Sequence, residues 1–286
     1  MLLQQLVNGL VAGCAYALVA LGYTMIFGIL GIVNFAQGEI YMYGAFGAVL
    51  TLAATGNLAL AIVAGIAAAC LVGVLLERFA FRPVRGMHPL IPLISAIGAS
   101  IFLSSLARLI FGPEDRSFPL EFHPGSHRFF GAELTELQLV IILVSLGLMV
   151  VLWLFLNLSK HGKAIMAVAM DSDAARLSGI NVNAAYVTTF ILGSALSGVA
   201  GILMAIYYNA TAPGMGLLPG LKAFSAAILG GVGSIPGAIV GGLVLGVAEN
   251  LGAAYLSSHF KDAFAFIALV LVLIIRPRGI MGSSRS

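Results

Sequence analysis

Apolar stretches long enough to cross a lipid bilayer recur along the whole chain. A transmembrane helix needs about 20 apolar residues, and a helix satisfies its own backbone hydrogen bonds, as a span in lipid must. The short alternating segments typical of a β-barrel are not seen. The pattern therefore predicts an all-α, polytopic transmembrane helical bundle with about eight passes. Short polar links separate apolar segments at about 5–33, 40–56, 58–77, 89–111, 137–157, 184–207, 221–249 and 262–275.

The composition agrees with a protein that lies in a membrane. Of the 286 residues, 60% are hydrophobic and only 9% are charged, whereas an average soluble domain has about 25% charged residues. A soluble domain with so few charges could not solvate its surface, so lipid is expected to cover much of the exterior. No linker to a soluble domain is visible, and we expect residues 1–286 to form a single transmembrane domain.

The basic residues predict which loops face the cytoplasm. They gather in the links after the third and fifth apolar segments and in the C-terminal tail, and short loops rich in Lys and Arg stay on the cytoplasmic side. The link at 112–136 is mainly acidic and is expected outside. The loop at 158–183 and the C-terminus are then cytoplasmic, and the N-terminus lies outside. The basic residues are Arg78, Arg82, Arg85, Lys160, Lys163, Arg176, Arg276, Arg278 and Arg285.

A Gly-rich run at 230–237 interrupts the segment 221–249. It reads Gly-Gly-Val-Gly-Ser-Ile-Pro-Gly, and it cannot continue a helix comfortably, because glycine is flexible and Pro236 has no amide proton. We therefore expect two short half-helices that flank an irregular turn. The loop at 158–183 and the C-terminal tail are both predicted to be cytoplasmic, and the segments 184–207 and 262–275 supply two crossings between them. The segment 221–249 must therefore cross twice or dip in and return, and both alternatives stay open.

A second break is predicted at 34–39, which reads Asn-Phe-Ala-Gln-Gly-Glu. Both breaks are preceded by Ile-Leu-Gly-x-Val, so they lie at similar places in the two halves of the chain. Broken helices at corresponding places are the best sequence indication of a transporter's path. The alternative is that Gly-rich apolar strings recur by chance in a chain with 35 glycines.

The first break brings polar side chains to a hydrophobic region. Asn34, Gln37 and Glu39 are candidates for a solute path or its gate. A carboxylate near hydrocarbon is costly, so Glu39 is either functional or an anchor at the membrane interface, and Glu249 carries the same ambiguity. Three neighbouring charges are expected to mark segment ends with their polar heads in the interface, namely Lys222, Lys261 and Asp262.

The cytoplasmic loop at 158–183 contains the signals of a short helix. Asp171 and Asp173 suit a helix N-terminus, where a carboxylate can cap free amides, and Gly179 suits its end. Such a helix would lie across the cytoplasmic face and could simply tie two spans together. The chain has no Gly-x-x-x-x-Gly-Lys-Ser/Thr phosphate loop, no metal-type cluster, no Gly-x-Ser-x-Gly elbow and no His-Glu-x-x-His motif, so we expect no catalytic residues and no metal site.

One string in this loop is similar to a known family motif. Asp173-Ala174-Ala175, with Gly179 four positions later, resembles the Glu-Ala-Ala-x-x-x-Gly coupling motif of ATP-binding-cassette (ABC) importer permeases. It departs from the maltose-type members by Asp at the first position and by the lack of a following Ile-x-Leu-Pro. Further ordered strings resemble the first of the two permeases of bacterial branched-chain amino-acid (Liv-type) ABC importers. These strings lie at 23–28, 34–39, 77–85, 93–98, 222–231, 233–238 and 277–280.

The resemblance implies how the chain is assembled and driven. Its coupling helix would dock on an ATPase subunit, and two cytoplasmic ATPase subunits, a homologous second permease and a periplasmic solute-binding protein would complete the importer. The binding protein would dock near 112–136 and 209–220. ATP and Mg would be held by the partner subunits, so this chain would be a non-catalytic permease domain without a cofactor. The coupling residues would be Asp171, Asp173, Ala174, Ala175, Arg176 and Gly179.

The resemblance also implies a location, a path and a cargo. The chain would be a multi-pass protein of the bacterial inner membrane, and it would pass leucine, isoleucine, valine or a related neutral amino acid. A binding protein would supply most of the selectivity, so exposed backbone could line much of the path. The expected path residues are Asn34, Gln37, Glu39, Gly231, Gly233, Ser234, Pro236 and Glu249.

Three other functions compete with this interpretation. Related urea and short-chain amide importers share much of the pattern. A self-sufficient secondary transporter or channel would also suit broken helices, but it would leave the Asp-Ala-Ala loop unexplained, and no network of buried acids is obvious. A membrane enzyme has no visible catalytic set.

Overall fold

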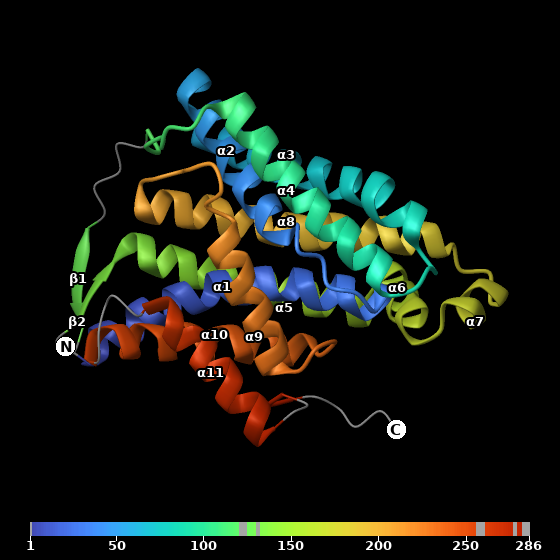
Figure 1. The fold of residues 1–286 in the computed structure, drawn as a ribbon. Helices are drawn as coiled ribbons and strands as arrows, with labels where there is room; N and C mark the ends of the chain where they lie inside the picture. The colour runs from blue at the N-terminus through green and yellow to red at the C-terminus, as the bar shows by residue number, and fades with distance from the viewer. Residues whose placement is uncertain (1, 120–124, 130–131, 256–260, 277–278, 282–286) are drawn as a thin grey trace.

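The computed structural model describes residues 2–119, 125–129, 132–255, 261–276 and 279–281 (Figure 1). Arg278 and Arg285 of the predicted basic tail, and the first two residues of the 277–280 string, lie outside this part of the chain. The helices are α1 (Leu2–Leu30), α2 (Gln37–Thr55), α3 (Leu58–Leu75), α4 (Leu90–Phe111), α5 (Glu136–Leu158), α6 (Lys160–Met170), α7 (Ser172–Leu177), α8 (Val182–Tyr208), α9 (Leu217–Gly230), α10 (Ile235–Tyr255) and α11 (Lys261–Ile275).

Two features interrupt the regular helices. After α3 the chain continues as a π-helical turn, Leu76–Phe81, and a 3-10 turn, Arg82–Val84. The acidic link contains a small antiparallel hairpin of β1 (Ser126–Phe129) and β2 (Ala132–Thr135). The predicted all-α polytopic bundle is confirmed. Within the described residues, six helices are long and apolar enough to cross a membrane: α1, α3 with its continuation, α4, α5, α8 and α10.

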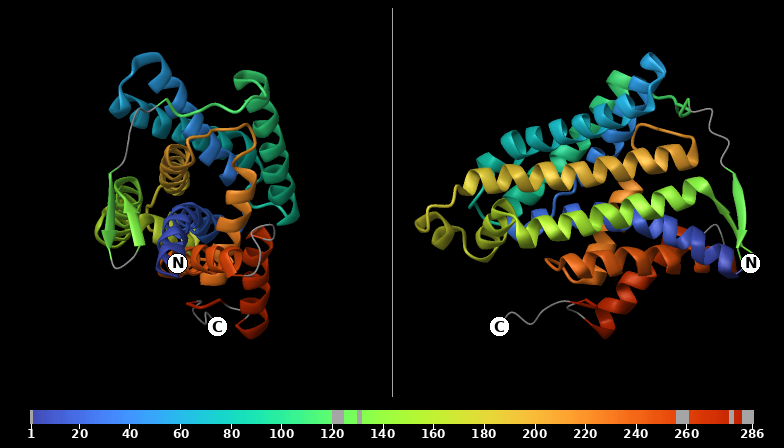
Figure 2. Two further views of the ribbon diagram at one scale, coloured as in Figure 1. Left: turned by 90° about the vertical axis from the view of Figure 1, so that its left-hand side faces the viewer. Right: turned by 180° about the vertical axis from the view of Figure 1, so that it is seen from behind.

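The long helices run along one axis of the molecule, and the two kinds of predicted loop lie at its opposite ends (Figures 1 and 2). The start of α1 lies at the same end as β1 and β2, whereas α7 lies at the other end. This arrangement matches the prediction that the acidic link and the loop at 158–183 face opposite sides of the membrane.

Helix α1 lies in the centre of the bundle and packs most extensively against α10. Gly9 and Gly13 of α1 lie against Gly246 of α10, and Ala17 lies against Gly242, with no room for added Cβ atoms. Small residues let helix backbones approach closely in lipid, where dispersion contacts replace the hydrophobic effect between helices. The small residues of α1 and α10 therefore form the core that positions the two breaks.

Several helix ends follow local capping signals. Thr135 and Gln138 form a capping box that starts α5, which satisfies amides that have no partner within the helix. The Asn181 side chain accepts from the amide of Ala184 at 3.1 Å and starts α8. Gly56, with a φ of 66°, ends α2 in the left-handed conformation that favours glycine.

The first break occupies 31–36, about three residues before the predicted position. Gly31 has a φ of 68° and ends α1, whereas Gln37 already belongs to the first turn of α2. The break was predicted too late in the chain because the polar residues Gln37 and Glu39 suggested irregular backbone. Both residues instead lie in the first turn of α2. The amide of Ala36 donates to Asn34 Oδ1 at 3.1 Å, which fixes the turn just before α2.

The second break occupies 231–234, inside the predicted run. Gly231 and Gly233 have φ values of 108° and 87°, a region open to glycine at little cost. Helix α9 has 14 residues, as expected of a short half-helix. Helix α10 has 21 residues and is long enough to cross, so the prediction of a second short half-helix is wrong. The helix continues past Glu249 because that carboxylate is paired inside the protein.

Candidate functional site

The first turns of α2 and α9 meet inside the bundle without side chains between them. Gly38 lies against Gly216 and Gly220, and a Cβ at Gly38 or Gly216 would overlap the backbone of the other. Glycine is needed here because only its lack of a Cβ permits this approach. The Gln37 amide donates to the carbonyl of Gly193, in the middle of α8, at 3.0 Å. The N-terminus of α2 therefore lies deep in the molecule, and the start of α9 packs against it.

A cavity of about 220 Å³ lies where these helix ends meet. We call it the Glu39 cavity, and its walls come from α1, α2, α4 and α9, together with Phe35 of the first break and Gly216 just before α9. Glu39 is only 2% exposed, so it is not an exposed anchor. Its Oε1 accepts a hydrogen bond from Ser100 Oγ at 3.3 Å. Its Oε2 is buried and has no hydrogen-bond partner among the described residues.

Asn34 and Gln37 lie next to Glu39 but have protein partners. Asn34 Nδ2 donates to Gln37 Oε1 at 3.1 Å, and Gln37 Nε2 donates to Ser197 Oγ at 2.7 Å as well as to Gly193. Neither residue lines the Glu39 cavity. Their polar atoms hold the first break against α8, while Glu39 faces the open space.

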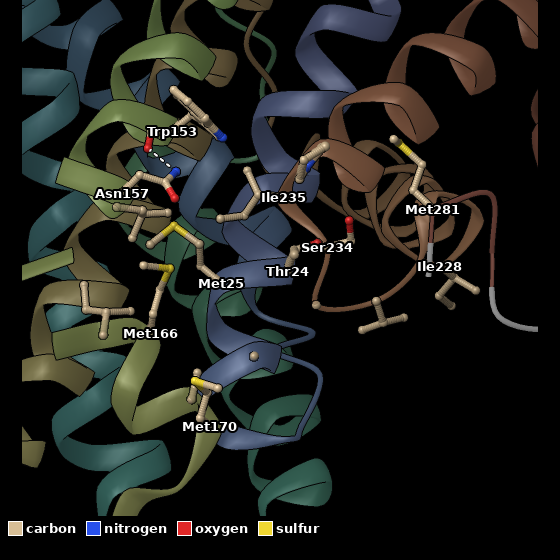
Figure 3. Close-up of a pocket in the computed structure, with 17 residues that line it drawn as sticks. Thr24, Met25, Trp153, Asn157, Met166, Met170, Ile228, Ser234, Ile235 and Met281 are labelled. Atoms are coloured by element: carbon tan, nitrogen blue, oxygen red, sulfur yellow. Dashed lines mark hydrogen bonds between the residues drawn. The ribbon is translucent and has the colours of Figure 1, made fainter. Parts of the chain in front are cut away.

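A second cavity, of about 750 Å³, lies at the break between α9 and α10 (Figure 3). Its walls come from α1, the last turns of α5, α6 and the second break, so it lies toward the end of the molecule that carries α7. We call it the Met-lined cavity, because Met25, Met166, Met170 and Met281 face it. Methionine is flexible and fits surfaces of varied shape.

Three of the four predicted path residues at the second break line this cavity, namely Gly233, Ser234 and Pro236. Gly231 does not. It lies under the chain segment 279–281, where a Cβ at Gly279 would overlap it. The same segment is tied to the end of α9, since the Met281 amide donates to the carbonyl of Gly230 at 2.9 Å.

Aromatic rings separate the two cavities. Phe224 of α9 has its ring centre 5.8 Å from that of Tyr23 and 5.7 Å from that of Phe35. We call these three residues the aromatic cluster. Tyr23 and Phe35 line the Glu39 cavity. Tyr23, Phe224 and Val232 border a space of about 10 Å³, and Val232 also lines the Met-lined cavity. The aromatic cluster and Val232 therefore link the walls of the two cavities.

Glu249 lies in a buried ion pair instead of in either cavity. Its Oε1 is 2.8 Å from Lys222 Nζ and 3.7 Å from Lys261 Nζ. Lys222 also pairs with Asp262 at 2.5 Å and donates to the Tyr16 hydroxyl at 3.5 Å. The Lys222 side chain is buried, so the expectation that it marks a segment end in the interface is wrong. This cluster joins α9, α10 and α11.

The short helix predicted in the loop at 158–183 is present as α7. Asp171 Oδ1 accepts from the amides of Asp173 and Ala174, at 2.9 Å and 3.0 Å, and Gly179 follows the helix with a φ of 82°. Ala175 is buried against the bundle, whereas Leu177 is 91% exposed. The helix therefore stands at the end of the molecule with its remaining predicted residues at the surface, namely Asp173, Ala174 and Arg176.

A set of contacts that the sequence did not indicate holds the start of α8. Arg85 Nη2 pairs with Glu77 Oε1 at 2.5 Å, and Arg85 Nη1 donates to Asn183 Oδ1 at 3.0 Å. The guanidinium also lies 3.6 Å from the centre of the Tyr186 ring. We call these four residues the Arg85 clamp. The sequence feature that could have indicated this clamp is Glu77. It is an acid at the end of an apolar segment, and it needs a partner if it is buried.

Comparison with known proteins gives consistent relatives. The family described as "Branched-chain amino acid transport system / permease component" matches residues 5–274. The branched-chain amino acid permease protein LivH of Escherichia coli K12 is 44% identical, and BraD of Pseudomonas aeruginosa is 46% identical, each over 98% of this chain and 95% of the relative. A probable LivH of Methanocaldococcus jannaschii is 30% identical over 93% of this chain and 88% of the relative.

The fold also has a counterpart among solved structures. PsaBC from Streptococcus pneumoniae, in complex with Fab, has a TM-score of 0.50 and covers 95% of this chain and 91% of its own. The sequences are 12% identical, so this likeness concerns the fold alone.

Proposed function

The chain belongs to the branched-chain amino acid transport permease family, and from this premise we propose that it is the membrane-spanning permease of an ABC importer for branched-chain or related neutral amino acids. The observation that carries the proposal is the identity of 44–46% over almost the whole length of LivH and BraD. Those relatives are named as permease proteins of high-affinity branched-chain amino acid transport systems.

The two cavities and the aromatic cluster support a path through the bundle. We assign the Glu39 cavity to the outer part of the path and the Met-lined cavity to the cytoplasmic part, because the latter lies toward the α7 end. The aromatic cluster is then the barrier that a solute must pass. Asn34 and Gln37 hold the first break, while Glu39, Gly233, Ser234 and Pro236 face the solute. Gly231 and Glu249 position the helices of the second break.

The position of α7 supports its role as the contact to an ATPase subunit. Leu177 is exposed at the end of the molecule, and Ala175 anchors the helix to the bundle. The Arg85 clamp holds α8 shortly after α7, so a push on α7 is passed both to α8 and to the turn that follows α3. In this proposal two ATPase subunits hydrolyse ATP, and this chain converts their closure into movement of the broken helices.

The remaining partners follow from the same premise. A homologous second permease completes the transmembrane part, and a periplasmic binding protein delivers the amino acid at the end formed by β1, β2 and the residues before α9. The chain then sits in the inner membrane with its N-terminus outside and its C-terminus in the cytoplasm.

Purification of the tagged chain from its native membranes in a mild detergent tests this assembly. The expected co-purifying proteins are two ATP-binding subunits and a second permease of the same family. A chain that purifies alone, even after gentle crosslinking, would contradict the proposal and favour a self-sufficient transporter.

A further inference from the structure

Two buried carboxylate oxygens lack a hydrogen-bond partner among the described residues, Glu39 Oε2 and Glu249 Oε2, but only the Glu249 carboxylate has lysines beside it. Glu39 is 2% exposed, and its Oε1 accepts from Ser100, while its Oε2 accepts no hydrogen bond from any described residue. Among the described residues no cation lies within ion-pair distance of it, although Arg108 acts on it electrostatically from a greater distance. A buried carboxylate is expensive unless it is paired, so this oxygen is suited to a cationic group that arrives from outside the chain.

The N-terminus of α9 also borders the Glu39 cavity. Gly216 and Leu217 line the cavity. The amides of Gly216 and Leu218 find no acceptor within the described part of the chain. The first amides of a helix have no intrahelical partner and lie at its positive end, which favours anions such as carboxylates.

The rest of the wall is mainly apolar and encloses a small volume. Phe35, Ile97, Ile101 and Leu221 face the space. Its volume of about 220 Å³ suits one small amino acid.

We propose that the Glu39 cavity is a transient binding subsite for a zwitterionic α-amino acid with an aliphatic side chain. The ammonium group pairs with Glu39 Oε2, the carboxylate lies at the N-terminus of α9, and the side chain packs against the apolar wall. This inference rests on the proposed function, and it adds that the permease itself recognises the amino-acid head group. Urea and simple amides carry no ammonium group and would not satisfy Glu39.

Saturation-transfer NMR on the purified, assembled importer without its binding protein tests the subsite. The probes are leucine and the hydroxy acid with the same carbon skeleton, in which a hydroxyl replaces the ammonium group. Leucine is expected to receive saturation on its methyl groups, and the hydroxy acid is expected to bind roughly tenfold more weakly or worse, because a hydrogen bond to a charged group is lost. This comparison uses the wild-type importer and needs no variant.

Substitutions then assign the contact to Glu39. Glu39→Gln keeps the size of the side chain and is expected to lower the leucine signal by roughly tenfold, and Ser100→Ala is expected to lower it less. Glu114→Gln is the matched control, since it makes the same chemical change at an exposed residue outside the cavity and should keep the signal. Co-purification of the ATPase subunits shows that each variant is assembled.

The outcomes separate the subsite from the proposed function. Equal binding of leucine and the hydroxy acid, or an unchanged leucine signal in Glu39→Gln, would overturn the subsite. If the wild-type importer in proteoliposomes takes up branched-chain amino acids in that case, the proposed function stands and only the subsite is lost. If the wild-type importer neither binds nor takes up any of them, both inferences are overturned.

Discussion

The guanidinium of Arg85 lies 3.6 Å from the centre of the Tyr186 ring. Arg85 follows α3, whereas Tyr186 lies in the first turns of α8, just after α7, the helix that we propose contacts the ATPase. Contacts with Glu77 and Asn183 complete the Arg85 clamp. A planar guanidinium can make an ion pair and stack on a ring at the same time. The clamp therefore links the two elements that must move together if α7 transmits force.

Removal of Arg85 is expected to destabilise the protein, because Glu77 would be left buried without a partner. Breaking such a pair costs about 3–5 kcal/mol. Arg85→Met should therefore lower the thermal unfolding midpoint of the purified importer clearly. The double variant Glu77→Gln/Arg85→Met removes both charges and should recover part of this loss. Equal midpoints for the single and double variants, measured by scanning fluorimetry, would exclude a clamp held by this charge pair.

The ion pair of Lys222 and Glu249 predicts an asymmetry between its two partners. Lys222→Met leaves Glu249 with only Lys261, whose Nζ lies 3.7 Å away. Glu249→Gln leaves Lys222 paired with Asp262. Because an unpaired buried charge costs about 3–5 kcal/mol, Lys222→Met should reduce the amount of folded protein more than Glu249→Gln does. The measurement is monodisperse yield in detergent.

The double variant Lys222→Met/Glu249→Leu tests whether this pair has a structural role. Replacing a buried pair by apolar residues is often neutral for stability, so the double variant should fold and keep amino-acid uptake. A stable double variant that no longer transports would instead indicate that Glu249 lies in the translocation path.

The contact between α2 and α9 predicts that two glycines cannot be replaced. A Cβ at Gly38 or Gly216 would overlap the backbone of the facing helix, so Gly38→Ala and Gly216→Ala should each force the helix ends apart and lower uptake by about tenfold or more. Gly147→Ala is the control. Gly147 lies within α5 with open space around it, and alanine should stabilise that helix by about 0.5–1 kcal/mol. Normal uptake by Gly38→Ala would disprove the need for close contact.

The exposed side chain of α7 predicts a variant that affects coupling without affecting the fold. Leu177 is 91% exposed, and surface substitutions usually change stability by about 0.5 kcal/mol or less. Leu177→Asp should therefore insert and fold normally but co-purify with much less ATPase subunit, because a charge would enter an apolar contact. Thr55→Ala, at the other end of the molecule, should retain the ATPase. Full retention by Leu177→Asp would place the ATPase contact elsewhere.

Features with local causes could be predicted from the sequence. In the described part of the chain, six of the eight predicted apolar segments contain a helix long and apolar enough to cross a membrane, whereas those at 40–56 and 262–275 do not. The glycines at 231 and 233 predicted the second break, and Asp171 and Gly179 predicted both ends of α7. In each case the cause lies in the residues themselves or in their near neighbours, as a capping carboxylate or a positive φ requires.

Features that depend on distant partners could not be predicted. Lys222 was expected at a segment end, because a single charge in an apolar stretch is costly and nothing local identifies its partner. Its partner Glu249 is 27 residues away and comes close only because α9 and α10 fold back on each other. The first break was expected three residues late for a similar reason, since Gln37 is buried in a helix whose polar partners lie in α8.

ATP-driven uptake by the reconstituted importer tests the central claim most directly. Proteoliposomes would hold this chain, the second permease and the ATPase subunits, with the binding protein and labelled leucine added outside. We predict uptake that requires both ATP and the binding protein, and that falls by about tenfold or more in Leu177→Asp. Uptake by this chain alone, without ATP or any ATPase subunit, would show that it works as a self-sufficient transporter and would contradict its assignment as an ABC importer permease.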